Sequence, residues 1–169
     1  MSKKRFYVQI LIKVCIIIAV VAIDLLTKHY FQQYFKNGGD DVAIINGVLG
    51  ITYVQNTGGA FGVLSSNTTL LVLFTVLFIV IFSFVDIGTK TFNGWYLTGF
   101  TLIMGGAIGN FIDRIFLGYV RDFIEFKFID FPVFNFADIF LTVGVICYLI
   151  YLVFYEMIKP KSKKNAIDE

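Results

Sequence analysis

Four long apolar segments with almost no ionisable side chains constrain the fold of this 169-residue chain more than any other feature. The chain is 57% hydrophobic and 15% charged, whereas a water-soluble domain is about 45–50% apolar and about 25% charged. Each segment is close to the ~20 residues that a helix needs to cross ~30 Å of hydrocarbon. We therefore predict an all-α integral membrane protein, one domain over residues 1–169, with four transmembrane helices at about residues 7–28, 68–85, 95–112 and 139–157.

The basic residues predict how these helices are oriented. Lys3, Lys4 and Arg5 precede the first span, and four lysines follow the last span between Lys159 and Lys164. Positively charged flanks stay on the cytoplasmic side, so we expect both termini in the cytoplasm and both long connections outside. These flanks explain the net charge of +2, and we expect no nucleic-acid partner.

The first segment has a second interpretation, because basic residues before an apolar run also begin a cleavable signal peptide. The run ends in Asp24-Leu25-Leu26-Thr27-Lys28 rather than in small residues suited to cleavage. We therefore favour an anchored first helix.

Both outward connections show patterns of extended structure. In the first, from about Tyr30 to Asn67, Val42–Ile45 and Val48–Gln55 are rich in β-branched residues and lie between glycine-containing turns, which predicts short strands. An open sheet edge cannot face hydrocarbon, so the sheet is expected at the outer interface. In the second, from Arg114 to Ala137, Pro132 excludes a continuous helix. We predict a small β-sheet and a partly extended loop on the outer face.

Ionisable groups at membrane depth are costly, so those that persist there are candidates for function. Under the predicted topology, six such groups lie near the outer ends of the spans. They are Asp24, Lys28, Asp113, Arg114, Asp122 and Asp138.

Each of these groups also has a structural interpretation. Asp24 and Lys28 are four residues apart and can pair along one helix. Asp138 lies at a helix start, where the unpaired N–H groups favour a carboxylate. Asp113 and Arg114 can form an interfacial ion pair, beside a glycine-rich helix contact of the small-residue type.

Asp122 and Asp138 form a more specific pair. They lie 16 residues apart, and the loop between them contains Pro132 and can bring the two carboxylates together. In a shared low-dielectric site one carboxyl holds a proton while the other acts as a base, which is sufficient to hydrolyse a peptide bond. The sequence lacks zinc-helix and serine-hydrolase motifs, and Cys15 and Cys147 have no metal-ligand spacing. We expect no metal and no cofactor.

Five sequence motifs, in order along the chain, resemble those of the lipoprotein signal peptidase family, also called signal peptidase II. The similarity extends from the first span to Gly144. The motifs are Asp24-Leu25-Leu26-Thr27-Lys28, Asn56–Gly62, Gly106–Arg114, Val120–Phe123 and Phe134–Asp138.

The resemblance implies an aspartic endopeptidase of the bacterial cytoplasmic membrane, with its active site near the outer leaflet. Its substrate would be a diacylglyceryl-modified prolipoprotein, cut immediately before the lipidated cysteine, so membrane lipid and this precursor are the expected partners. The family's catalytic pair corresponds to Asp122 and Asp138. Its supporting residues correspond to Asn56, Asn110, Arg114 and Asn135, and its structural aspartates to Asp24 and Asp113.

The sequence departs from the family pattern at Leu25, Gly59, Arg121 and Glu125. Arg121 matters most, because a cation beside Asp122 would favour the ionised carboxylate. The assignment of base and acid within the pair is therefore open at this stage.

Two other classes of function fit an apolar chain with these carboxylates. A small proton-coupled transporter would relay protons through Asp24, Asp113 and Asp138, but it needs charges near the membrane midplane. A non-catalytic membrane scaffold would tolerate replacement of both Asp122 and Asp138.

Overall fold

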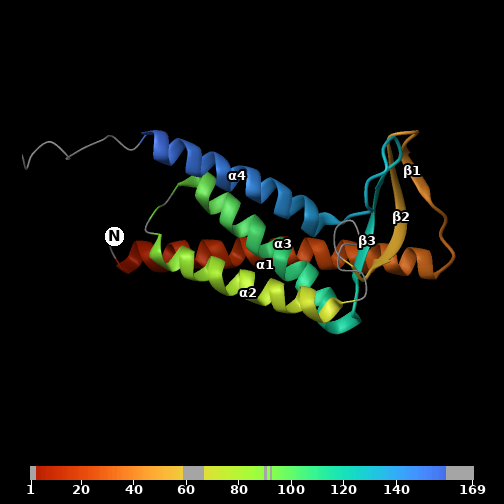
Figure 1. The fold of residues 1–169 in the computed structure, drawn as a ribbon, viewed down its shortest axis with the longest axis horizontal. Coiled ribbons are helices and arrows are strands. Elements are labelled where there is room, and N and C mark those ends of the chain that lie inside the picture. The colour runs from red at the N-terminus through yellow and green to blue at the C-terminus, as the bar shows by residue number, and fades with distance from the viewer. Residues whose placement is uncertain (1–2, 59–66, 90, 92, 159–169) are drawn as a thin grey trace, which may run out of the picture.

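The computed structural model describes residues 3–58, 67–89, 91 and 93–158. Four helices run back and forth in an antiparallel bundle, and a small sheet lies across one end of it (Figure 1). All four helices are long and apolar enough to cross a membrane, which confirms the predicted membrane fold. The elements are α1 (Lys3–Lys36), β1 (Val42–Ile45), β2 (Leu49–Asn56), α2 (Thr68–Gly88), α3 (Gly94–Leu117), β3 (Val120–Phe126) and α4 (Phe136–Ile158).

Helix α3 is the centre of the bundle and packs against the other three helices. A row of glycines makes the close approach possible, as the sequence predicts. A Cβ on Gly105 would collide with Val20 of α1, and one on Gly106 would lie 2.5 Å from the backbone oxygen of Ala137. Small residues at a helix contact let backbones approach closely. This packing brings α1 and the start of α4 together at the same level of α3.

Helix α2 lies at the edge of the bundle, and none of its described residues is buried. Polar contacts hold both of its ends. Near its start, the Thr68 hydroxyl donates to the backbone oxygen of Gly118 at 3.0 Å. Near its end, Asp86 pairs with Lys13 of α1 and accepts a 2.6 Å hydrogen bond from the Tyr96 hydroxyl of α3.

The sheet has the strand order β1-β2-β3, and both pairings are antiparallel. The two strands expected in the first outward connection are confirmed at β1 and β2. The second connection is more ordered than expected, because Val120–Phe126 pairs with β2 as a third strand. The register sets Asp122 opposite Val54 and Val120 opposite Asn56.

Three spans extend further outward than predicted, and α4 is one of them, because it begins at Phe136 rather than at residue 139. Helix α1 has 34 residues and is about 50 Å long, so residues 30–36 belong to the helix and not to the loop. This extension persists because it supports the sheet: the Phe31 ring stacks on Phe123 with centroids 4.4 Å apart, and Phe35 stacks on Tyr53 at 6.0 Å. Helix α3 likewise reaches Leu117, so Arg114 lies within a helix.

Candidate active site

Asp122 lies on β3 with 1% of its surface exposed, and side chains from two other segments hold it. The amide nitrogen of Asn56, at the end of β2, donates to Oδ2 at 2.8 Å. The amide nitrogen of Asn135, just before α4, donates to Oδ1 at 2.6 Å. The strand pairing and the loop before α4 together fix the position of this carboxyl group.

Asp138 lies in the first turn of α4, where it caps the helix as its position in the sequence suggests. The backbone N–H of Asp138 donates to Asn135 Oδ1, and the backbone N–H of Asn135 donates to Asp138 Oδ2, both at 3.1 Å. This reciprocal arrangement is a capping box. The other oxygen, Oδ1, accepts a 2.8 Å hydrogen bond from the side chain of Asn110. Capping therefore accounts for only one of the two carboxylate oxygens of Asp138, and the other oxygen is held by Asn110.

Both carboxyl groups face one pocket of about 390 Å³. Asn56, Asn110 and Arg114 supply the rest of its polar lining. Arg114 has a buried Nε with no hydrogen-bond partner among the described residues. One wall is mostly apolar and comes from β3, the following loop and α4. It comprises Val120, Phe126, Phe131, Pro132, Val133, Phe134, Ile139, Thr142 and Val143.

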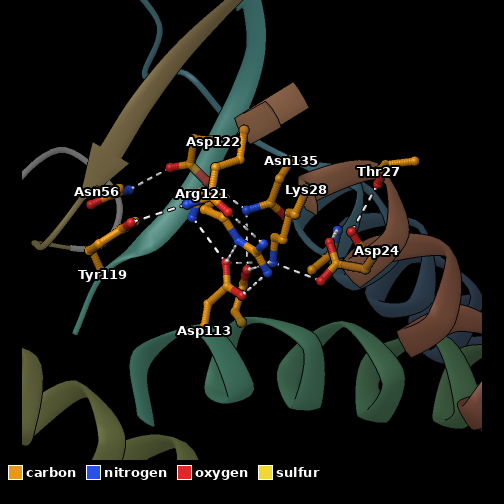
Figure 2. A network of polar contacts seen from close by, with 12 residues as sticks. Asp24, Thr27, Lys28, Asn56, Asp113, Tyr119, Arg121, Asp122 and Asn135 are labelled. Carbon is orange, nitrogen blue, oxygen red and sulfur yellow. Dashed lines mark hydrogen bonds and ion pairs between the residues drawn. The ribbon is translucent and has the colours of Figure 1, made fainter. Parts of the chain in front are cut away.

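A buried network of charged groups lies behind the pocket (Figure 2). The Lys28 ammonium contacts Asp24 Oδ2 at 2.7 Å, Asn110 Oδ1 at 2.8 Å and Asp113 Oδ2 at 3.8 Å. Asp24 also accepts the backbone N–H of Ala137 at 2.9 Å, which ties α1 to the start of α4. The network thus connects the first helix to the residues that hold both pocket carboxylates.

Arg121 belongs to this network, and the expectation that it lies as a cation against Asp122 is wrong. Successive residues of a strand point to opposite sides, and Arg121 turns to Asp113. Its Nε and Nη2 donate to the two oxygens of that carboxylate at 3.0 and 2.6 Å. Burial lowers the pKa of Arg121, but the hydrogen bonds and charge of Asp113 outweigh it and raise the pKa overall. Asp113 therefore pairs with Arg121 and Lys28, and not with Arg114 as the alternative interpretation supposes.

The surroundings of Asp122 favour its protonated form. Burial is the largest cause and the negative charge of Asp138 adds to it, so the pKa of Asp122 rises to about 7. Hydrogen bonds from Asn56 and Asn135, and the charge of Lys28, act in the opposite direction. Two carboxyl groups that share one pocket, one of them able to hold a proton near neutrality, are suited to general acid and base chemistry.

Comparison with known proteins agrees with this geometry. The family model described as signal peptidase (SPase) II matches residues 16–154. A lipoprotein signal peptidase of Lactobacillus johnsonii is 41% identical over 91% of this chain and 97% of that protein. The chain belongs to the signal peptidase II family.

Further relatives extend the similarity. A lipoprotein signal peptidase of Enterococcus faecalis is 36% identical over 87% of this chain and 91% of that protein. A solved structure of a bacterial membrane enzyme has a TM-score of 0.78 and 32% identity, and covers 90% of this chain and 93% of that one.

The structure brings most of the signal peptidase II motifs to one place. Asn56, Asn110, Arg114, Asp122 and Asp138 line the pocket. Asn135 is not among the lining residues but holds both Asp122 and Asp138, and Asp24 and Asp113 belong to the adjoining charged network. Part of the second motif, residues 59–62, lies outside the described residues.

The sequence analysis did not identify Gln32 or the apolar wall of the pocket. The side chain of Gln32 accepts from Arg121 Nη1 at 3.2 Å and donates to the Tyr119 hydroxyl at 3.3 Å. The signal was present, because Asp24, Lys28 and Gln32 are spaced by four and share a helix face. The predicted span ended at Lys28, so Gln32 was assigned to the loop and not to this helix face.

Proposed function

We propose that this member of the signal peptidase II family is an aspartic endopeptidase, with Asp122 and Asp138 as its catalytic pair. The family removes signal peptides from prolipoproteins, which requires hydrolysis of an amide bond at the membrane. The observation that carries the proposal is the position of Asn135, which donates to both carboxyl groups where they face one pocket.

The charges around the pocket favour one proton on the pair. Three cationic side chains, Lys28, Arg114 and Arg121, face four carboxyl groups in the pocket and its network. Three cations neutralise three carboxylates, so a single proton on the fourth leaves the cluster neutral. A buried cluster in a low dielectric favours this state. The raised pKa of Asp122 makes it the acid, which leaves Asp138 as the base.

The reaction then proceeds without a covalent intermediate. Asp138 takes a proton from water, the water oxygen bonds to the scissile carbonyl carbon, and Asp122 gives its proton to the carbonyl oxygen. When the intermediate collapses, the C–N bond breaks and the leaving nitrogen takes the proton held by Asp138. Asp122 recovers its proton from one of the two hydroxyl groups of the intermediate, and the oxygen of that hydroxyl becomes the carbonyl oxygen of the new carboxyl group.

The polar side chains around the pair have separate roles in this proposal. Asn56 and Asn135 hold Asp122 in place through their amide donors. Arg114 offers donors to the substrate backbone, because it lines the pocket. Asp24 and Asp113 act structurally through their ion pairs.

The position of the pocket supports a lipid-modified substrate. It lies at the sheet end of the bundle, opposite the start of α1 and the end of α4 (Figure 1). With both termini in the cytoplasm of a bacterial cell, this end lies at the outer leaflet of the cytoplasmic membrane. A diacylglyceryl-cysteine is held there by its acyl chains, and the apolar wall of the pocket suits the residues beside it.

A cleavage assay tests this function directly. The purified protein in detergent receives a diacylglyceryl-modified precursor or an otherwise identical unmodified precursor. We expect cleavage of the modified precursor only, immediately before the lipidated cysteine, and no effect of a chelator. Equal cleavage of both precursors would contradict the proposed substrate class, and no cleavage of either would contradict the peptidase function.

Cysteine labelling in intact cells tests the orientation. With the native cysteines replaced, Asp40→Cys should react with an impermeant reagent added outside, and Lys163→Cys should react only after lysis. The reverse pattern would place the pocket on the cytoplasmic side.

A further inference from the structure

The buried ammonium of Lys28 has a partner that an ordinary helix ion pair does not explain. Besides Asp24, it donates to the side-chain oxygen of Asn110 at 2.8 Å. Asn110 in turn donates from its nitrogen to Asp138. Lys28 is fully buried, so bulk solvent does not reach these contacts.

These contacts allow only one orientation of the Asn110 amide. Lysine is a donor without acceptor capacity, so the amide atom that faces it must be the oxygen. The amide nitrogen of Asn135 also points at this oxygen, at 3.1 Å. A flipped amide would set its NH₂ group against two donors and its oxygen against the Asp138 carboxylate. The nitrogen of Asn110 is therefore directed at Asp138.

We propose that Lys28 is a positioning residue for the peptide cleavage, which fixes the Asn110 amide so that its nitrogen donates to Asp138. The inference deepens the proposed function and rests on it, because it assigns Lys28 a task at the same catalytic pair. The hydrogen bond from Asn110 holds the Asp138 carboxylate in place at the pocket.

The charge of Lys28 has a second effect, on the other carboxyl group. It lowers the pKa of Asp122, against the larger effects of burial and of Asp138. The charged groups that face Lys28 come from every element packed around it. They are Asp24 on α1, Asp113 on α3 and Asp122 on β3, with Arg121 of β3 reached through Asp113 and Asp138 of α4 through Asn110.

The test must remove the ammonium without leaving a buried charge unpaired. Lys28→Met alone leaves Asp24 uncompensated, so the informative protein is the double variant Asp24→Asn/Lys28→Met. It is neutral at both positions and keeps an oxygen for the N–H of Ala137. Asp24→Asn alone retains Lys28 and is its direct comparison. Lys13→Met/Asp86→Asn is the control, because it neutralises an ion pair between α1 and α2 at the far end of the bundle.

We expect Asp24→Asn/Lys28→Met to insert and bind the lipidated precursor with KM within about twofold of the parent. Its kcat should fall about 10- to 100-fold, the range for a lost hydrogen bond to a charged group. The alkaline limb of its pH–rate profile should move upward by at least about 0.5 pH unit, because Asp122 loses a nearby positive charge. Asp24→Asn should not move the alkaline limb upward, because it retains the positive charge of Lys28. Lys13→Met/Asp86→Asn should keep both the limb and kcat.

A parental alkaline limb in the folded double variant would overturn the role of Lys28, as would an equal shift in Lys13→Met/Asp86→Asn. If the double variant is not made, Lys28→Arg provides the second measurement. It retains the charge and the donor-only character, so the limb should stay at the parental pH even if kcat falls, and a shifted limb would overturn the inference. Failure of the proposed function would be recognised by a different result, because the Asp138→Asn protein would then remain active.

Discussion

Asn135 and Asp138 cap each other at the start of α4, where the backbone N–H of each donates to a side-chain oxygen of the other at 3.1 Å. The same asparagine also reaches Asp122 with its amide nitrogen, at 2.6 Å. One structural device thus begins a transmembrane helix and sets the distance between two carboxyl groups that lie 16 residues apart in the sequence.

Asn135→Ser separates these two tasks. Serine is about as good an N-cap as asparagine, so the thermal stability in detergent should stay near that of the parent. Serine is too short to reach Asp122, so turnover of the lipidated precursor should fall about tenfold or more. Asn135→Ala should lose the turnover and also about 1 kcal/mol of stability. A serine variant with parental turnover would show that the contact with Asp122 is dispensable.

The pH dependence of turnover should reflect the proton on the catalytic pair. The raised pKa of Asp122, about 7, means that this group is protonated below that pH and ionised above it. Turnover should therefore fall as the pH rises through about 7, because the acid loses its proton. It should also fall at acidic pH, where no base remains. The apparent values belong to the pair, and a rate that rises steadily to pH 9 would contradict the assignment.

The glycine contact between α3 and α4 should be intolerant of even one methyl group. A Cβ at Gly106 would lie 2.5 Å from the Ala137 backbone oxygen and 2.8 Å from Leu141 Cγ. Gly106→Ala should displace the start of α4, lower stability by about 1–3 kcal/mol and reduce turnover. Gly94→Ala is the matched control on the same helix, since a Cβ there meets nothing within 4 Å. Equal behaviour of the two variants in thermal unfolding would show that the close contact is not limiting.

Arg121 should matter for folding more than for the chemistry. It makes a two-point contact with the buried Asp113, so Arg121→Leu leaves that carboxylate with Lys28 at 3.8 Å as its remaining ion-pair partner among the described residues. Breaking a buried pair costs about 3–5 kcal/mol, which should appear as a lower unfolding temperature in detergent. Arg121→Lys should recover part of the loss. An unchanged unfolding temperature in Arg121→Leu would show that another group compensates Asp113.

The membrane fold could be predicted from the sequence because lipid imposes a simple pattern. Long apolar runs located all four helices, and turn glycines located the strands β1 and β2. The helix ends were harder to predict, because hydropathy marks where lipid ends and not where the helix ends. Helix α1 continues on the sheet through Phe31 and Phe35, and the positive φ of Gly38, 86°, lies just beyond its last residue.

The site could be predicted only in part, because motifs identify residues but do not show which way their side chains point. Asp122 and Asp138 were recognised as a pair, and the structure places both at one pocket. The partner of Arg121 could not be deduced, because it depends on which side of β3 faces α3. The contact of Lys28 with Asn110 spans 82 residues, and a local pattern cannot reveal it.

The most direct test of the account is the turnover of a diacylglyceryl-modified precursor by Asp122→Asn and Asp138→Asn proteins that are confirmed to be made and membrane-inserted. Asparagine keeps the shape of aspartate, and at position 138 its side-chain oxygen can still accept the backbone N–H of Asn135 in the capping box, but it cannot exchange the required proton. We predict that each variant binds the precursor with near-parental affinity and loses at least about 1,000-fold in turnover. Turnover by the Asp138→Asn protein within a few-fold of the parent would contradict the aspartic mechanism.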